Sequence, residues 1–423
     1  MAAKYPLSPA MWRFVEHSRA FASDSPRLDA QRAAYARMCQ AFAPPRPAGL
    51  RVLDSCLPAA PPVRVRRYRP DRPAPPGGWP ALLYLHGGGW MLGGLDSHDF
   101  ICADLAARLG LLVLAVDYRL APEHPFPAAL QDCLRAWQAL SLGELDEALD
   151  GRRLLVAGDS AGGNLAAALC LALRDGGAPS PAAQILLYPL LSAAPSPSRI
   201  DCADAPLLGL GDVQACLDAY LPLAALHRQP LALPLEAADF TGLPPAFVAV
   251  AEFDPLRDDG ERYGAALRAA GGEAGFYPGS GLVHGCLRGH GIDEVEALHE
   301  ALRRAVQGFL AEDSGERQAG EESTAEHQQI RVDNGQYIPQ THRQQIEIAL
   351  NVRLRARIVL LPLRHNLRRG ERLLIKMFVQ PGETATGEII FNTAQLAAAA
   401  AQQRKIAPNH LQGIHRQANM TEL

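Results

Sequence analysis

Apolar residues along this chain fall into two patterns, short continuous runs and longer stretches in which they recur at helical spacing. Such short runs are typical of strands that are buried on both faces. Strands that alternate with helices predict a mostly parallel sheet covered by helices on both sides, so the expected fold class is α/β. The expected strands are residues 81–86, 111–117, 154–157, 184–188 and 246–252, with helices near 97–109, 127–140, 161–174 and 256–270.

Two segments depart from this rhythm. Residues 1–50 contain amphipathic helical pieces that end in a proline-rich breaker, and residues 191–240 are rich in Pro, Ala, Leu and Asp. We expect both segments to form a helical cap. The cap would cover a catalytic domain of residues 51–312, which begins with strand-like alternation at 51–54 and 63–68.

The composition changes after a helix that is expected to end near Leu310. Residues 313–330 are acidic and poor in large apolar residues, which is typical of a linker. Residues 331–423 carry 13 lysines and arginines against 6 acidic residues, although the whole chain has a net charge of -4. Alternation at 352–358 and near 373–379 predicts a strand-rich extension, followed by a helix near 394–405. Its arginines could bind nucleic acid or an acidic protein partner, but a solvated strand face is the favoured interpretation.

The bulk composition excludes some classes of protein. With 423 residues, of which 48% are hydrophobic, the chain can bury a large core and is not disordered throughout. The eight cysteines form neither a CxxC pair nor a dense framework, which favours free thiols and a reducing, cytoplasmic location. We expect no membrane association, because residues 1–20 lack the apolar segment of a secretory signal and no long apolar run is present.

The most informative motif, Gly158-Asp159-Ser160-Ala161-Gly162, lies between an expected strand and an expected helix. A G-x-S-x-G sequence in that setting is typical of a nucleophile elbow, a tight turn that exposes the serine hydroxyl. The two glycines remove side chains that would collide in such a turn. Ser160 is therefore the candidate nucleophile.

Residues 86–90 form a loop with three successive glycines, here called the glycine-rich loop, directly after the strand expected at 81–86. Successive glycines leave main-chain N–H groups open to a small anion, and a developing alkoxide needs such donors. We expect the amides of Gly88, Gly89 and Ala161 to form an oxyanion hole. Gly87 is expected to shape the turn, with its amide as an open alternative donor.

A catalytic acid is expected directly after a later strand, because catalytic groups gather at the carboxyl ends of strands in open α/β sheets. Asp254 has this position. Asp258 and Asp259 are less favoured because they begin the next helix, where a carboxylate commonly only stabilises the helix. Glu252 is a weaker alternative, since it precedes the end of the strand.

The candidate base comes last in the chain. His284 lies in a glycine-rich loop after strand-like residues 275–277 and is the best of the late histidines. His290 stays an alternative, whereas His299 lies in a helical stretch with charged neighbours and is expected to be solvated. The order serine, acid, histidine is the order found in α/β-hydrolase triads. No cofactor or metal is expected, because the histidines and cysteines lack ligand spacing.

Five motifs in order resemble the hormone-sensitive-lipase family of bacterial esterases over about residues 1–312: those at 86–89, 117–123, 158–164, 254–258 and 284–285. The resemblance implies an α/β-hydrolase core with a helical cap, no cofactor, and hydrolysis of short-chain carboxylic esters. It also implies particular roles: Ser160 as nucleophile, His284 as base, Asp254 as the orienting acid, Gly88, Gly89 and Ala161 as oxyanion donors, and His86, Gly87 and Asp159 in support.

Two features depart from the family pattern. Cys286 stands where an aromatic residue often follows the His-Gly pair, which alters the wall beside His284 or exposes a reactive thiol. Residues from about 316 onward match no module of the family. Glu123 and His124, in the 117–123 region and just after it, are expected to be structural rather than catalytic.

The motifs predict an acyl-enzyme but leave its acceptor open. An amidase, a deacetylase or a transacylase would use the same groups, so these activities are alternatives to ester hydrolysis. A non-catalytic ligand-binding protein on the same scaffold is less favoured, because the complete set of candidate groups is present. The expected partner is a small-molecule ester, and the sequence predicts no oligomeric state.

Overall fold

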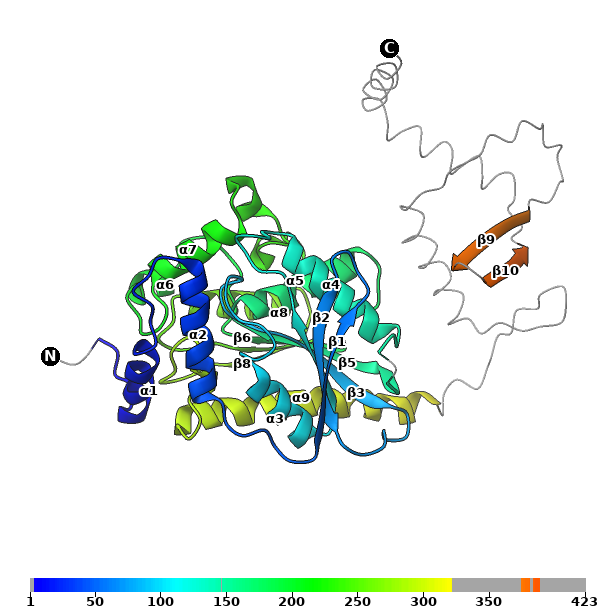
Figure 1. Ribbon diagram of the computed structural model, residues 1–423, viewed down its shortest axis with the longest axis horizontal. Coiled ribbons are helices and arrows are strands. Elements are labelled where there is room, and N and C mark those ends of the chain that lie inside the picture. Colours follow the sequence, from blue (N-terminus) through cyan, green and yellow to red (C-terminus); the bar gives the residue numbers. More distant parts are fainter. Residues whose placement is uncertain (1–3, 146, 322–373, 381–382, 389–423) are drawn as a thin grey trace, which may run out of the picture. The chain divides into compact units, whose positions relative to one another are not determined.

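Eight strands of the computed structural model form one sheet in the order β1-β2-β4-β3-β5-β6-β7-β8 (Figure 1). β2 is antiparallel to both β1 and β4, whereas all the other neighbouring strands are parallel. The prediction of a mostly parallel α/β sheet is therefore confirmed. The strands are β1 Leu50–Leu57, β2 Val63–Pro70, β3 Trp79–Leu85, β4 Leu112–Asp117, β5 Leu149–Asp159, β6 Ala183–Leu187, β7 Ala246–Ala249 and β8 Ala274–Tyr277.

The structure describes residues 4–145, 147–321, 374–380 and 383–388. Between the strands lie helices close to the positions that the apolar spacing predicted. The α-helices are α1 Pro9–Arg19, α2 Leu28–Phe42, α3 Asp99–Leu109, α4 Ala128–Ser141, α5 Ala161–Asp175, α6 Pro197–Asp201, α7 Leu210–Tyr220, α8 Arg257–Ala269 and α9 Asp293–Glu321, and the short 3₁₀ helices are η1 Ala224–Arg228, η2 Pro234–Glu236 and η3 Cys286–Arg288.

Two apolar cores cover the two faces of the sheet. Every residue of β3 is buried, and because side chains alternate along a strand, Leu82 and Leu83 belong to different cores. Leu83 packs in the core that includes Trp137 of α4, whereas Leu82 packs in the core that includes Ile101 of α3 and Leu302 of α9. Figure 1 shows α3 and α9 on one side of the sheet and α4, α5 and α8 on the other. This burial explains the continuous apolar runs in the sequence.

The candidate site lies at the edge where the parallel strands end. β3 ends directly before the glycine-rich loop, β5 ends directly before Ser160, and β7 ends a few residues before Asp254. Because these strands are parallel, their carboxyl ends meet at the same edge of the sheet. The sheet topology thus brings together motifs that are far apart in the sequence.

Arg32 attaches helix α2 to this edge of the sheet. Its guanidinium pairs with both carboxylate oxygens of Glu123, at 2.7 and 2.8 Å. The same side chain donates to the carbonyl oxygens of Met91, at 2.8 Å, and Ala121, at 3.1 Å. Glu123 therefore anchors α2 beside the glycine-rich loop, in keeping with the structural role expected for it.

Helix α9 runs on to Glu321, so the predicted end near Leu310 is wrong. The residues beyond Leu310 are mostly Ala, Glu, Gln and Arg, which are good helix formers despite their polarity. The start of the acidic segment 313–330 is accordingly helical, and its residues 322–330 lie outside the described part of the chain. No helix among the described residues is long and apolar enough to cross a membrane.

The chain divides into two units, Met1–Ile348 and Ala349–Leu423. In the second unit the structure describes an antiparallel pair, β9 Leu374–Gln380 and β10 Glu383–Glu388. β9 coincides with the alternation near 373–379. The strand predicted at 352–358 and the helix predicted at 394–405 lie outside the described residues.

Candidate active site

Ser160 lies in a sharp turn between β5 and α5, as the elbow motif predicted. Its backbone has φ 55° and ψ -119°, a conformation that non-glycine residues rarely adopt. A Cβ atom on Gly158 would lie 2.3 Å from the carbonyl oxygen of Gly162, and one on Gly162 would lie 2.0 Å from that of Leu85. Only glycine fits at these two positions, and the tight turn they permit presents the Ser160 hydroxyl to the cavity.

The structure brings Ser160, His284 and Asp254 together in one chain of hydrogen bonds. Ser160 Oγ lies 2.8 Å from His284 Nε2, and His284 Nδ1 lies 2.7 Å from Asp254 Oδ2. The other carboxylate oxygen of Asp254 accepts from the Leu256 amide at 2.8 Å. Asp254 is fully buried, and Ser160 and His284 are each 9% exposed. An ionised Asp254 keeps the proton of His284 on Nδ1, so that Nε2 accepts from the serine hydroxyl.

The competing carboxylates have other partners. Glu252 accepts from the Gly281 amide at 2.7 Å and so shapes the loop that carries His284. Asp258 accepts from the Ser198 amide at 2.9 Å. Asp259 was expected only to stabilise the start of α8, and this expectation was wrong. It is fully buried, lies 3.0 Å from Nη2 of Arg199, and accepts from two main-chain amides of the segment that follows β6.

The late histidines other than His284 lie away from Ser160. His290 stacks on His299, with ring centroids 5.4 Å apart. His299 was expected to be solvated, yet it is buried, and its Nε2 lies 2.9 Å from the Leu287 carbonyl oxygen. The cause is the packing of α9 against η3, which the charged neighbours of His299 in the sequence do not reveal.

The glycine-rich loop at residues 86–90 contains main-chain amides that have no hydrogen-bond acceptor in the part of the chain that the structure describes. Gly88 and Gly89 have φ angles of 124° and 59°, and both line the cavity beside Ser160. Within the described residues, the amides of Gly88, Gly89 and Ala161 donate to no acceptor. The Gly87 amide, in contrast, donates to Asp159 Oδ1 at 3.0 Å. Gly87 is therefore occupied by the turn, as expected, while the other three amides are free to bind an anion.

Asp159 and His86 hold this loop in place through contacts with the main chain of Gly87. Asp159 Oδ1 accepts from Tyr84 Oη and from the Gly87 amide, both at 3.0 Å, and Asp159 Oδ2 lies 3.1 Å from His98 Nε2. Burial raises the pKa of Asp159, but the neighbouring His98 and Arg288 and the hydrogen bonds outweigh it, so the pKa lies below its usual value. Asp159 is thus ionised and buried.

Burial lowers the pKa of His86 to about 3, so its ring is neutral. The ring stacks on Tyr118 at 4.2 Å, and Tyr118 Oη donates to the His86 carbonyl oxygen at 2.6 Å. Nδ1 of His86 lies 2.8 Å from the Gly87 carbonyl oxygen. These contacts fix the start of the glycine-rich loop.

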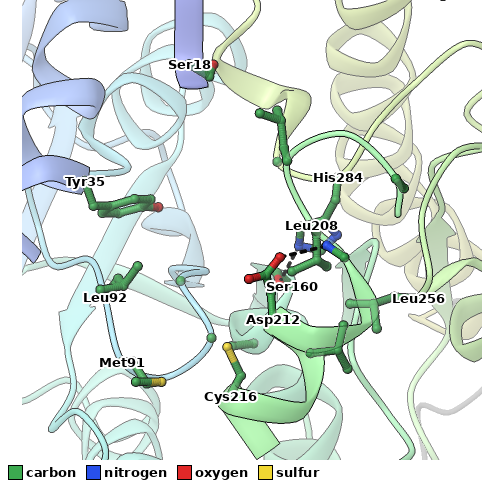
Figure 2. A pocket seen from close by; sticks show the side chains of 18 of the residues that line it. Ser18, Tyr35, Met91, Leu92, Ser160, Leu208, Asp212, Cys216, Leu256 and His284 are labelled. Atoms are coloured by element: carbon green, nitrogen blue, oxygen red, sulfur yellow. Dashed lines mark hydrogen bonds between the residues drawn. The ribbon is translucent and has the colours of Figure 1, made fainter. Parts of the chain in front are cut away.

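A cavity of about 680 Å³ opens over Ser160. Its walls include side chains of α1, α2 and α7, so both segments predicted to form the cap line it. Figure 2 shows Tyr35 across the cavity from Ser160 and His284, with Cys216 near the glycine-rich loop. A Cβ on Gly89 would lie 2.3 Å from Cys216 Sγ.

Sequence reasoning missed His98, Arg288, Tyr35 and Cys216, because each joins the site only through contacts between distant segments. It was also wrong about an exposed thiol at position 286: Cys286 is fully buried in the core beneath its loop, and burial raises its pKa. Among the described residues, no group of three or more histidine, cysteine or acidic side chains is placed to hold a metal ion.

Known proteins share this architecture and its motifs. Residues 82–288 match a family model described as alpha/beta hydrolase fold. The chain is 40% identical over 260 residues to the esterase LipI of Mycobacterium tuberculosis, covering 61% of this chain and 81% of LipI. It is 38% identical over 251 residues to an ethyl acetate hydrolase of Pseudomonas putida, covering 57% of this chain and 76% of that protein. The solved structure of a thermostable esterase from Pseudomonas putida ECU1011 has a TM-score of 0.67 at 30% identity, covering 72% of this chain and 97% of that one.

The fold and the hydrogen-bonded Ser-His-Asp arrangement define a serine hydrolase of the α/β-hydrolase class. Within this class, the similarity to known esterases identifies the family. The chain belongs to the hormone-sensitive-lipase family of carboxylesterases, the family that its sequence motifs resemble.

Proposed function

We propose that Ser160, His284 and Asp254 are the catalytic triad of this carboxylesterase. The observation that carries the proposal is the continuous hydrogen-bonded path from Ser160 Oγ through His284 to Asp254, with contacts of 2.8 and 2.7 Å. Ser160 attacks the ester carbonyl while His284 Nε2 takes its proton, since a free serine hydroxyl is a poor nucleophile near neutral pH. Asp254 orients the ring and stabilises the imidazolium that forms.

The amides of Gly88, Gly89 and Ala161 hold the oxyanion of the tetrahedral intermediate in this proposal. The free state of these three amides supports the assignment, because preorganised donors stabilise charge that develops in the transition state. The alcohol then leaves with the proton from His284. Water repeats the two steps on the acyl-enzyme and releases the acid.

His86, Gly87 and Asp159 act in support by holding the glycine-rich loop in place. The Gly87 amide is bound by Asp159, and the neutral His86 ring contacts the Gly87 carbonyl oxygen. With Gly87 fixed, the amides of Gly88 and Gly89 are held in place in the cavity wall that also includes Ser160.

The proposed substrates are short-chain acyl esters, held under a helical cap that α1, α2 and residues 191–240 build. The cavity volume of about 680 Å³ lies in the range of sites for small molecules. The relative named for ethyl acetate hydrolysis supports a small ester. Amide hydrolysis or acyl transfer would use the same acyl-enzyme, and these activities are the alternative outcomes of the test below.

Hydrolysis of p-nitrophenyl acetate, butyrate and laurate by the protein and by Ser160→Ala tests the proposal. We expect turnover of the two short esters, little of laurate, and none by the variant, with circular dichroism confirming that both proteins fold. No turnover by a folded wild type would overturn the ester assignment. A labelled acyl group found on an amine or alcohol rather than on water would favour a transacylase.

Two broader predictions stay proposals. The cytoplasmic location is supported by the eight cysteines, all of which are free thiols. A basic, strand-rich C-terminal extension is supported by the sequence alternation and by the β9–β10 pair. Whether its arginines bind nucleic acid or an acidic protein can be tested by salt-dependent binding of the full chain to each.

A further inference from the structure

Arg288 is a buried cation in the wall of the active-site cavity. It ends η3, four residues after His284, and is only 6% exposed. Its hydrogen bonds are made by one nitrogen, Nη2, which donates to Tyr35 Oη at 2.8 Å and to the Ser97 carbonyl oxygen at 3.3 Å. The same nitrogen lies 3.2 Å from His98 Nε2, whose own proton is donated to Asp159 Oδ2. Nε and Nη1 donate to no acceptor in the described part of the chain, and Nη1, unlike Nε, is not closed off from solvent.

No carboxylate of the described residues lies within 4.0 Å of Arg288. The equally buried Arg199 shows the usual arrangement, since it pairs with Asp259 at 3.0 Å. The ionised Asp159 favours the charged form of Arg288, and His98 Nε2 contacts both side chains, but the two Asp159 oxygens already accept from Tyr84, Gly87 and His98. Arginine is seldom buried without an ionic partner, because an unpaired buried charge is costly.

Aromatic rings replace only part of the missing partner. The Arg288 guanidinium lies 5.3 Å from the centroid of the Tyr35 ring and 5.8 Å from that of Phe100. Tyr35 Oη accepts from Arg288, and the hydrogen-bonding neighbour of its own proton is the Cys39 thiol, a weak acceptor that a carboxylate can replace. Tyr35 also lines the cavity, opposite Ser160 in Figure 2. This wall therefore offers N–H donors without an acceptor and an O–H donor that has only a weak one among the described residues.

Of the other charged residues that line the cavity, Arg19, Asp204 and Asp212 are exposed, whereas Asp159 is buried. Asp204 is exposed and is held by Lys4 and by Tyr5 Oη. Asp212 is exposed and accepts from the Gly209 amide at 2.8 Å. Exposed charges are screened by water, and both oxygens of the buried Asp159 already accept hydrogen bonds. Arg288 is therefore the buried charge of the cavity wall that still has donors for a substrate.

We propose that Arg288 and Tyr35 bind a carboxylate carried by the substrate at a distance from its scissile ester, so that half-esters of dicarboxylic acids are a substrate class of this enzyme. The inference rests on the proposed function, because it gives Arg288 and Tyr35 a substrate-binding role in the cavity that contains Ser160. The substrate carboxylate supplies the ionic partner that the protein lacks, and the Tyr35 hydroxyl donates a second hydrogen bond. Such a site would select substrates by charge as well as by chain length.

Binding to Ser160→Ala tests this site without any turnover, so a failure of the ester mechanism cannot be mistaken for a failure of the site. The ligands are monomethyl adipate and its neutral isostere, methyl 6-amino-6-oxohexanoate, measured by isothermal titration calorimetry. We expect the acid to bind at least about tenfold more tightly than the amide. Equal binding of the two ligands, or tighter binding of the amide, would overturn the proposal.

Arg288→Met in the same background should abolish the preference for the acid, and Arg288→Lys should retain part of it. Arg304→Met removes a positive charge from an exposed position on α9 and is the matched control, with affinity unchanged within about twofold. A preference that survives Arg288→Met would overturn the assignment. If Arg288→Met fails to fold, Tyr35→Phe, at a half-buried position, must still weaken binding of the acid more than binding of the amide, and equal weakening counts against the site.

Discussion

Phe253 and Val283 form a parallel bridge one residue before Asp254 and His284. The amide of Phe253 donates to the Leu282 carbonyl oxygen at 3.0 Å, so the loops after β7 and β8 are joined by their main chains. The next residue of each loop is a member of the proposed triad. The contact of 2.7 Å between Asp254 Oδ2 and His284 Nδ1 is thus fixed by backbone pairing.

Asp254→Asn should leave the fold intact and lower kcat for p-nitrophenyl butyrate by about 10³- to 10⁴-fold, because an amide at this position favours the wrong tautomer of His284. Steady-state kinetics measure the change. Asp175→Asn, at an exposed carboxylate paired with Arg174, is the control. Retention of more than about a tenth of the wild-type kcat would contradict the role of Asp254.

Gly89→Ala should lower kcat/KM at least about tenfold, because the loop must shift to accommodate the new Cβ and the oxyanion donors move with it. There are two obstacles: Cys216 Sγ would lie 2.3 Å from that atom, and the φ angle of 59° disfavours any residue with a Cβ. The double variant Gly89→Ala/Cys216→Ala should therefore recover part of the loss. Kinetics with p-nitrophenyl butyrate compare the variants, and a double variant no better than Gly89→Ala would place the cause elsewhere.

Because His86 is buried and neutral, we expect the free energy of unfolding to decrease as the pH is lowered. Its pKa is about 3 in the folded protein, against an ordinary value of 6.5. Between these two pH values the unfolded chain binds the proton and the folded chain does not, so acid favours unfolding. The slope contributed is about 1.4 kcal/mol per pH unit.

Urea unfolding of the wild type and of His86→Gln at several pH values between 3 and 7 measures this slope. The variant should be less stable near pH 7 but should lose less stability on acidification. His124→Gln replaces an exposed histidine and should keep the wild-type slope. Parallel curves for His86→Gln and the wild type would show that another group controls the acid transition.

Removing one partner of the buried ion pair between Asp259 and Arg199 should strongly lower the free energy of unfolding. Asp259→Ala leaves Arg199 buried without its carboxylate, and we expect the free energy of unfolding to fall by about 3–5 kcal/mol. Replacing both residues, Asp259→Ala with Arg199→Met, should cost less than Asp259→Ala alone. Urea unfolding at pH 8, where Asp259 is ionised, compares the variants.

The sequence predicted those features that depend on local pattern. Strand and helix positions follow from apolar spacing, and the elbow around Ser160 follows from glycines whose added Cβ atoms would collide with main chain. The position of Asp254 after β7 was predictable because strand ends gather catalytic groups. In each case, a few consecutive residues are enough to predict the feature.

Contacts between segments far apart in the sequence were not predictable in the same way. Arg288 and Tyr35 are separated by 253 positions, and His98 meets Asp159 across 61. Nothing in the residues next to His98 or Arg288 signals these contacts. The errors at His299 and Asp259 have the same origin, because each meets a main-chain partner supplied by another element.

The walls of the cavity and its reacting groups come from different parts of the chain. Helices α1, α2 and α7 supply much of the lining, whereas Ser160 and His284 are held by the strands and the bridge beneath them. Sequence change in residues 1–42 and 210–220 can therefore alter which molecules are admitted while the chemistry stays intact. An enzyme built this way can acquire new specificities by drift in its helices, and grafting those helices from a relative is a route to redesign.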